Sequence, residues 1–363
     1  MKPRERILMA LDHEEPDRCP LYVGFTPEFA RRLERDLDFG KDKFHNPQWS
    51  GNTFQLDRVL GSDMLLAHVG WATSYYQEGS EYVDEWGIGW QSVEYQTAFG
   101  CGHYTEMVHH PLAQDAAIAS YKSPDPNRPA LYDDIAWAIR TFKDEYWIVG
   151  ATVTTIFESA WGLRGYERLL QDFALDPDLA EQVLDFPYRY HLEAAKNLVK
   201  MGVDMIWLGD DVGAQNAMLM SPKMWRRFLK PRMANFIAQL RSINPQVKIA
   251  YHSDGQIYPI IPDLIEIGLD ILNPIQPRSM DPARLKKEYG KQLSFWGSID
   301  EQFTLPFGSP ADVRDEVILR LKTLGKGGGL IIGPTHLMQL DTPMDNFWAM
   351  VNSIQRTTYT SLR

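Results

Sequence analysis

The feature that most constrains this chain is a regular alternation of strand-like and helical segments from residue 147 onward. Strands are predicted at 147–153, 205–208, 247–251, 270–273, 293–296 and 330–332, each leading into a helical segment. Such strict alternation implies parallel strands joined by crossover helices. Two weaker strand candidates, Cys19–Val23 and Asp63–His68, bring the total to eight. The predicted fold is therefore an α/β (β/α)8 TIM barrel, with an open doubly wound sheet as the alternative.

Helix starts are marked by a repeated pair in which a capping side chain precedes proline. The side-chain oxygen accepts from free N–H groups, while proline occupies a position that needs no intrahelical donor. The pairs are Thr26-Pro27, Ser221-Pro222, Asp281-Pro282, Ser309-Pro310 and Thr342-Pro343. The second pair predicts one long helix that ends near Ile243.

The N-terminal third has a different residue pattern from the rest of the chain. Between residues 38 and 146 the chain holds the aromatic segments WATSYYQ, EYVDEWGIGWQ and EYQTAFGCGHYTEMVHH. Their alternation of aromatic or β-branched residues with polar ones predicts β-hairpins and loops. We interpret this part as an elaboration over one end of the barrel, so that residues 1–363 form a single domain.

Composition narrows the class of function. The net charge is −11 and the cations form no stripe, which argues against a nucleic-acid partner. No apolar run approaches the ~18 residues that would span a membrane. The two cysteines, Cys19 and Cys101, lie in unrelated contexts, and the N-terminus has no apolar signal region. A cytoplasmic enzyme acting on a small molecule is the expectation.

Polar side chains follow the predicted strands, where a barrel places its active site. The most reactive pair is His252 and Asp254, which suit Zn²⁺ if other strands supply further ligands. The alternative is that His252 hydrogen-bonds a neighbouring loop and Asp254 caps a helix. The other candidates at strand ends are Tyr22, Phe25, Asp63, His68, Thr154, Glu158, Asp210, Asp211, Asn273, Gln276, Asp300 and His336.

Three acids among these candidates, Asp210, Asp211 and Glu158, each have two possible interpretations. Strand alternation sends Asp210 and Asp211 in different directions, so one is expected to bind the next loop while the other faces the pocket. Together they could complete a cation site or raise each other's pKa for proton transfer. Glu158 either joins the site or forms a salt bridge to Arg164.

The chain resembles the uroporphyrinogen decarboxylase superfamily in several segments. These are RERILMALDHEEPDRCPLYV, GDDVGAQNAMLMSPKMWRRFLKPRM, HSDGQIYPIIPDLIEIGLDILNPIQ, FWGSIDEQFTLPFGSPADVRDEV and GGGLIIGPTHLMQ. The resemblance covers nearly the whole chain and implies a (β/α)8 barrel with its site at the strand carboxyl ends. It also implies that Asp63 resembles the catalytic Asp of the decarboxylases and that His336 resembles their C-terminal site His.

Two departures favour the corrinoid-dependent methyltransferase branch over the decarboxylases. The RQAGR-type arginine segment of true decarboxylases is replaced by YVGFTPEFARRL. Thiol-methylating members of the other branch show His-x-Cys and a later Cys as zinc ligands. Here Asp254 stands in place of that first Cys, and no Cys follows residue 101. The resemblance therefore implies a zinc site of His252, Asp254 or alternatively Asp211, and His336, with nitrogen and oxygen ligands suited to an ether oxygen.

The resulting hypothesis is a methyltransferase that moves a methyl group from a methoxylated aromatic compound to a corrinoid protein. Catalytic roles are expected for Asp63, Glu158, Asp210 and Asp211, and substrate contacts for Tyr22, Phe25 and Gln276. The alternatives are a metal-independent decarboxylase of a tetrapyrrole or aromatic acid, and a non-catalytic corrinoid- or tetrapyrrole-binding protein. The sequence leaves the oligomeric state open, with a homodimer as one expectation.

Overall fold

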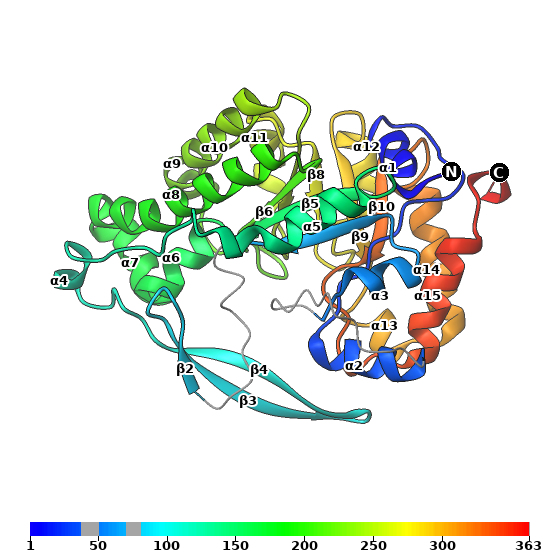
Figure 1. Cartoon of the computed structure of the whole chain (residues 1–363), viewed down its shortest axis with the longest axis horizontal. Coiled ribbons are helices and arrows are strands. Elements are labelled where there is room, and N and C mark those ends of the chain that lie inside the picture. Colours follow the sequence, from blue (N-terminus) through cyan, green and yellow to red (C-terminus); the bar gives the residue numbers. More distant parts are fainter. Residues whose placement is uncertain (38–50, 70–80, 363) are drawn as a thin grey trace.

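The computed structural model of the protein describes residues 1–37, 51–69 and 81–362. Its centre is a seven-stranded parallel sheet in the order β1-β5-β6-β7-β8-β9-β10, which curls round with helices outside it (Figure 1). The strands are β1 (Met64–His68), β5 (Trp147–Val153), β6 (Met205–Gly209), β7 (Lys248–His252), β8 (Ile271–Asn273), β9 (Ser294–Ile299) and β10 (Leu330–Pro334).

The gap between β10 and β1 is filled by the segment around Leu21. Leu21 forms a parallel bridge with Ile332 of β10, and its carbonyl accepts from the N–H of Asp63 at 2.8 Å. The predicted strand Cys19–Val23 is thus reduced to one bridge, because Pro20 has no N–H to extend the ladder. Seven strands and this bridge fill eight positions, and the predicted TIM-barrel class is confirmed.

Helices separate the strands and cover the outside of the sheet (Figure 1). The α-helices are α1 (Pro3–Leu11), α2 (Pro27–Asp36), α3 (Phe54–Val59), α4 (Asp115–Ile118), α5 (Asp133–Phe142), α6 (Phe157–Arg164), α7 (Tyr166–Leu175), α8 (Pro177–Met201), α9 (Pro222–Phe228), α10 (Lys230–Ile243), α11 (Ile261–Glu266), α12 (Pro282–Tyr289), α13 (Thr304–Phe307), α14 (Pro310–Thr323) and α15 (Met344–Arg356). Short 3-10 turns are η2 (Pro129–Tyr132), η3 (Tyr258–Ile260) and η4 (Tyr359–Leu362).

Several helices differ from the sequence prediction. The long helix expected from Ser221 to Ile243 is broken at Leu229 into α9 and α10, because Pro231 cannot donate the N–H that a continuous helix needs there. Helix α6 has no counterpart in the prediction, and neither do α3, α4, α5 and α13. Among the described residues, no helix is long and apolar enough to cross a membrane.

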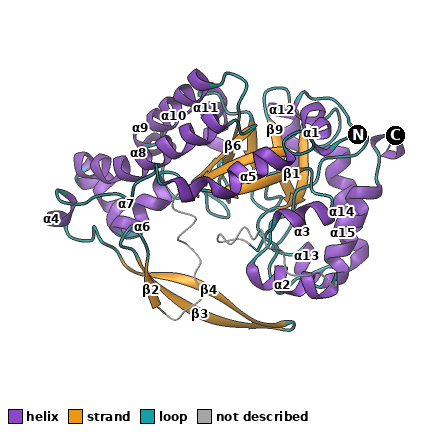
Figure 2. Cartoon of the chain, viewed as in Figure 1, coloured by secondary structure: helices purple, strands orange, loops and turns teal. Residues whose placement is uncertain are grey.

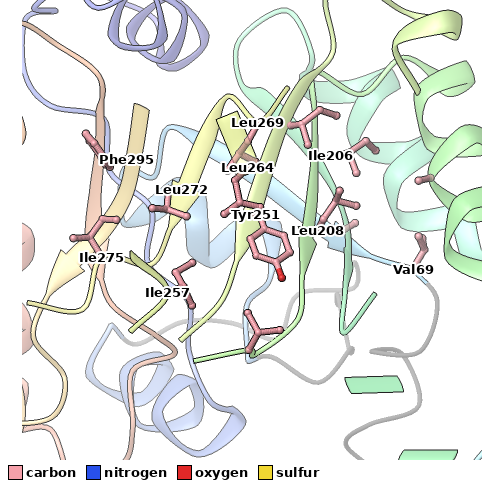
Figure 3. Packing of buried hydrophobic residues seen from close by; sticks show 14 of the residues in the cluster. Val69, Ile206, Leu208, Tyr251, Ile257, Leu264, Leu269, Leu272, Ile275 and Phe295 are labelled. Carbon is pink, nitrogen blue, oxygen red and sulfur yellow. The ribbon is translucent and has the colours of Figure 1, made fainter. Parts of the chain in front are cut away.

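Strand alternation divides the core into two clusters. Side chains that point outward pack beneath the helices, as Figure 3 shows for Leu208, Tyr251 and Leu272 on neighbouring strands. Side chains that point inward fill the barrel, including Trp207 and Trp296. Both sets are almost wholly buried, as expected for a parallel sheet covered on both faces.

A separate antiparallel sheet elaborates the N-terminal third. It contains β2 (Glu81–Val83), β3 (Gly89–Thr97) and β4 (Gly100–His109), and Figure 2 shows it as a long ribbon apart from the barrel strands. Its base is fixed by the Asp84 carboxylate, which accepts from Trp90 Nε1 at 2.9 Å. Its tip meets α2, where the Arg32 guanidinium lies 4.2 Å from the Phe99 ring centroid. The predicted hairpin elaboration is present, although WATSYYQ lies outside the described residues.

Asp63 does not lie where a catalytic role requires it. It directly precedes β1, so it sits at the amino end of the strand, whereas the predicted site is at the carboxyl ends. Its buried carboxylate accepts from Arg6 at 2.5 Å, from Arg18 at 2.7 Å and from the Leu21 N–H at 2.7 Å. The predicted catalytic placement of Asp63 is therefore corrected: the carboxylate joins α1, the Leu21 segment and β1.

Replacing Asp63 with Ala should lower the free energy of unfolding by about 3–5 kcal/mol, because two largely buried guanidinium groups lose their partner. Urea denaturation monitored by circular dichroism would measure this change. The control is Asp17→Ala, which removes a carboxylate that also binds Arg6 but is 43% exposed. That variant should cost about 1 kcal/mol or less. Equal stability of D63A and the wild type would contradict the structural role.

Candidate functional site

A cavity of about 300 Å³ opens at the carboxyl ends of the strands. It collects side chains from most of the strand ends, from the Tyr22 segment and α2, and from the hairpin. The barrel contributes Tyr22, Glu28, Val153, Thr154, Glu158, Trp207, Asp211, His252, Asn273, Trp296, Thr335, His336, Leu337 and Gln339, and the hairpin contributes Tyr95, His103, Tyr104 and Thr105. Segments far apart in the sequence therefore form a single concave surface.

The floor of this cavity is aromatic. The rings of Trp207 and Trp296 lie 4.8 Å apart between centroids, and Tyr22 meets Trp296 edge-on at 5.4 Å. Trp207 also meets the His252 ring edge-on at 5.6 Å. Such a floor offers an apolar surface of mutually tilted rings to a ring-shaped ligand.

His252 and His336 line the cavity, and together with Asp254 they bring one ligand atom each to within 4.8 Å of one another. The Asp254 Oδ1 atom is buried and makes no hydrogen bond, although it lies 3.9 Å from His252 Nε2. A buried carboxylate oxygen is usually paired, so this atom is suited to a ligand that is not part of the chain.

Asn273 fixes the orientation of His252. Its Oδ1 lies 2.8 Å from His252 Nδ1, which leaves Nε2 directed toward the carboxylates. A hydrogen bond on the other ring nitrogen is the usual support of a metal-binding histidine. Strand pairing places Gly209 beside His252, and a Cβ on Gly209 would approach the His252 Cβ to 2.6 Å. Glycine at this position therefore makes room for the imidazole.

The loop after β7 is held from both sides. The Asp254 N–H donates to Asp211 Oδ1 at 2.8 Å, and the Gly255 N–H donates to Gln276 Oε1 at 2.6 Å. Gly255 has a φ of +78°, and a Cβ there would meet the Ala214 carbonyl at 2.5 Å. Gln276 does not line the cavity, so its predicted substrate contact is replaced by a role in positioning Asp254.

Glu158 and Asp211 face the cavity together. Glu158 Oε2 accepts from the Asp211 N–H at 3.0 Å, and Asp211 Oδ1 lies 3.6 Å from His252 Nε2. Burial, reinforced by the negative charges of Asp211 and Asp210, raises the pKa of Glu158 well above its usual value. Glu158 is therefore the group in this cavity that is set up to carry a proton at neutral pH. Arg164, the alternative partner of Glu158, pairs instead with Asp172 and Asp115.

Asp210 points away from its neighbour Asp211, as strand alternation predicts. It is 1% exposed, and its carboxylate accepts from the N–H groups of Ile156 and Glu158 at the start of α6. Desolvation raises the pKa of Asp210 to about 7. Its predicted catalytic role is thus corrected to that of capping α6, a helix that the sequence pattern missed because its cap comes from another strand.

Phe25 also lies outside the cavity. Its ring is fully buried and packs against Phe29 and Phe347, with centroids 5.9 and 6.0 Å away. The predicted substrate contact is corrected to a core contact. Two cavity residues that the sequence reasoning missed, Trp207 and Trp296, could have been found from strand alternation, which turns both toward the barrel interior.

Comparison with known proteins gives a family match and several relatives. The family model for uroporphyrinogen decarboxylase (URO-D) matches residues 96–357. Methylcobamide:CoM methyltransferase MtaA of Methanosarcina barkeri is 29% identical over 174 residues, so the match spans about half of each chain (48%). Uroporphyrinogen decarboxylase of Psychromonas ingrahamii is 23% identical over an alignment of 380 residues that covers 96% of each chain.

Among solved structures, a methyltransferase from Methanosarcina mazei aligns with a TM-score of 0.71 at 19% identity and covers 98% of each chain. This likeness supports the barrel fold. Because the family model covers well over half of the sequence, the chain belongs to the uroporphyrinogen decarboxylase family.

Proposed function

We propose that this protein is a corrinoid-dependent methyltransferase that demethylates a small methoxylated aromatic compound, with a zinc ion held by His252, Asp254 and His336. The observation that carries the proposal is that these three side chains lie within ligand distance of one another, next to a cavity that contains the indole rings of Trp207 and Trp296. The relatives named methyltransferases support the class of reaction. The ligand set supports an oxygen, rather than a thiolate, as the group to be activated.

The three residues fit a zinc ion in their donor chemistry. Two imidazoles and a carboxylate leave an open tetrahedral position, as in catalytic zinc sites. The unpaired Oδ1 of Asp254 would gain a partner, and Asn273 already holds His252 in the required orientation. When bound, zinc supplies Lewis acidity to an oxygen of the substrate.

The remaining residues bind the ring and manage the proton. Trp207 and Trp296 form the apolar wall that the aromatic ring of the substrate would contact. In the proposed reaction the methyl C–O bond would break, and a reduced corrinoid carried by a partner protein would supply the electron pair and accept the methyl group. The ether oxygen keeps the electrons of the broken bond and takes a proton from the Glu158 carboxyl.

Decarboxylation of a porphyrinogen is a poorer match to the cavity. Among the described residues that line it there is no Lys or Arg, while Glu28, Glu158 and Asp211 are present. A substrate with several carboxylates would lack cationic partners and meet like charges. The volume of about 300 Å³ is at the small end for ligand pockets. A tetrapyrrole-binding role without catalysis is disfavoured on the same grounds.

The direct test is incubation with a reduced corrinoid protein and a panel of methoxybenzenes, following the absorption change of the corrinoid on methylation. Neutral ethers should react with a kcat/KM at least about tenfold above that of matched methoxybenzoates, because the cavity carboxylates repel the anion. Release of CO₂ from the benzoates without corrinoid methylation would instead establish the decarboxylase.

Removal of the support for His252 should weaken zinc binding. Asn273→Ala is expected to lower the zinc affinity by about 10- to 100-fold, because the ring loses its orienting hydrogen bond. His252→Ala should reduce zinc content to background. Competition with a chromophoric chelator would measure both. Asn235→Ala on the exposed face of α10 is the matched control. Undiminished zinc content in H252A would place the metal elsewhere.

Glu158→Gln should lower kcat by about 10²- to 10⁴-fold, because the amide cannot protonate the leaving oxygen. The loss should shrink for ethers that release a more acidic phenol, since such leaving groups need less protonation. Glu167→Gln on the exposed face of α7 is the control. A uniform loss across leaving groups would show that Glu158 positions Asp211 and does not transfer the proton.

A further inference from the structure

A second group of metal-ligating side chains lies on the β3–β4 hairpin, outside the barrel triad. Glu94, Cys101 and His103 each offer one ligand atom within 4.8 Å of the others. The antiparallel register explains why they lie close together. Glu94 lies directly opposite His103, and Cys101 precedes His103 by two residues, on the same face of β4. Directly opposed and diagonal pairs are close enough for side chains of this length to touch.

The contacts among the three residues leave one carboxylate oxygen directed at the imidazole. Gln96 Nε2 donates to Glu94 Oε1 at 2.9 Å, while Glu94 Oε2 lies 4.0 Å from His103 Nε2. The Cys101 thiol donates to the Gly102 carbonyl at 3.7 Å and lies within 4.8 Å of ligand atoms of Glu94 and His103. Gln96 thus supports the ligand carboxylate as an outer partner does in a metal site.

We propose that Glu94, Cys101 and His103 form a second cation site, selective for a borderline or soft dication such as Zn²⁺ or Co²⁺. Thiolate, imidazole and carboxylate are each zinc donors, and a set that contains a thiolate and an imidazole is unsuited to Mg²⁺ or Ca²⁺. Binding releases the thiol proton to solvent. The charges of the thiolate and the carboxylate then balance that of the dication, and water takes the fourth position.

Because this site lies next to the cavity, a bound cation would affect the cavity wall. The hairpin is anchored at its base by Asp84 and at its tip by Arg32 and Phe99. Between these anchors His103 lines the cavity, although its side chain is 49% exposed. A cation that joins β3 to β4 here would fix His103 and the part of the hairpin that borders the cavity.

The test uses the full chain with the barrel triad removed by His252→Ala and His336→Ala. Apoprotein of this variant, reduced and freed of metal by a chelator, is titrated with Co²⁺. We expect one equivalent to bind, with the near-ultraviolet charge-transfer absorption of a cobalt thiolate. Adding Cys101→Ser should abolish this absorption, and adding Glu94→Gln should weaken binding. Since activity is not the readout, the result is independent of the proposed methyl transfer.

A second measurement follows the thiol itself. Saturating Zn²⁺ should slow the reaction of Cys101 with an aromatic disulfide reagent by about tenfold or more, because a metal-bound thiolate is shielded from exchange. Mg²⁺ should have no effect. Cys19 is buried and serves as the internal reference. Cobalt absorption that is absent, or that persists after Cys101→Ser, would overturn the proposal, as would equal protection by Mg²⁺.

Discussion

The register of three neighbouring parallel strands is the constraint on which the site depends. It sets Gly209, His252 and Asn273 side by side at the carboxyl ends of β6, β7 and β8. Glycine gives the imidazole its space, and the asparagine gives it an orientation. A shift of one residue in this pairing would turn His252 into the outer layer and leave the triad without its centre.

Around these three residues, hydrogen bonds between the loops of neighbouring strands fix the positions of the site side chains. Asp210 binds the amide groups that begin α6, which in turn presents Glu158 to the cavity. Asp211 and Gln276 hold the backbone of the loop that carries Asp254. Several polar side chains near the site thus act through backbone groups. Only some of the polar residues at the strand ends therefore face the cavity.

The relatives of this chain include a methyltransferase and a decarboxylase. The lining of the cavity bears on which of these two activities fits this protein. Carboxylates and aromatic rings line the described cavity, which suits a neutral ring better than a polyanion. The oxygen of Asp254 would make a metal site formed by this triad harder in its ligand chemistry than a thiolate would. Both features belong to individual side chains on a shared fold, in keeping with the general separation of fold from function.

The sequence by itself determined the barrel class, most element boundaries from residue 147 onward and the opposite directions of Asp210 and Asp211. Those features follow from local periodicity, capping residues and alternation, which neighbouring residues encode. Only the tertiary structure decided that Asp63 pairs with two arginines, that Phe25 is core, and that Gln276 holds a loop. Each of these depends on which distant residue occupies the facing position, and no local pattern carries that information. The meeting of Glu94, Cys101 and His103 depends in the same way on the register of the hairpin.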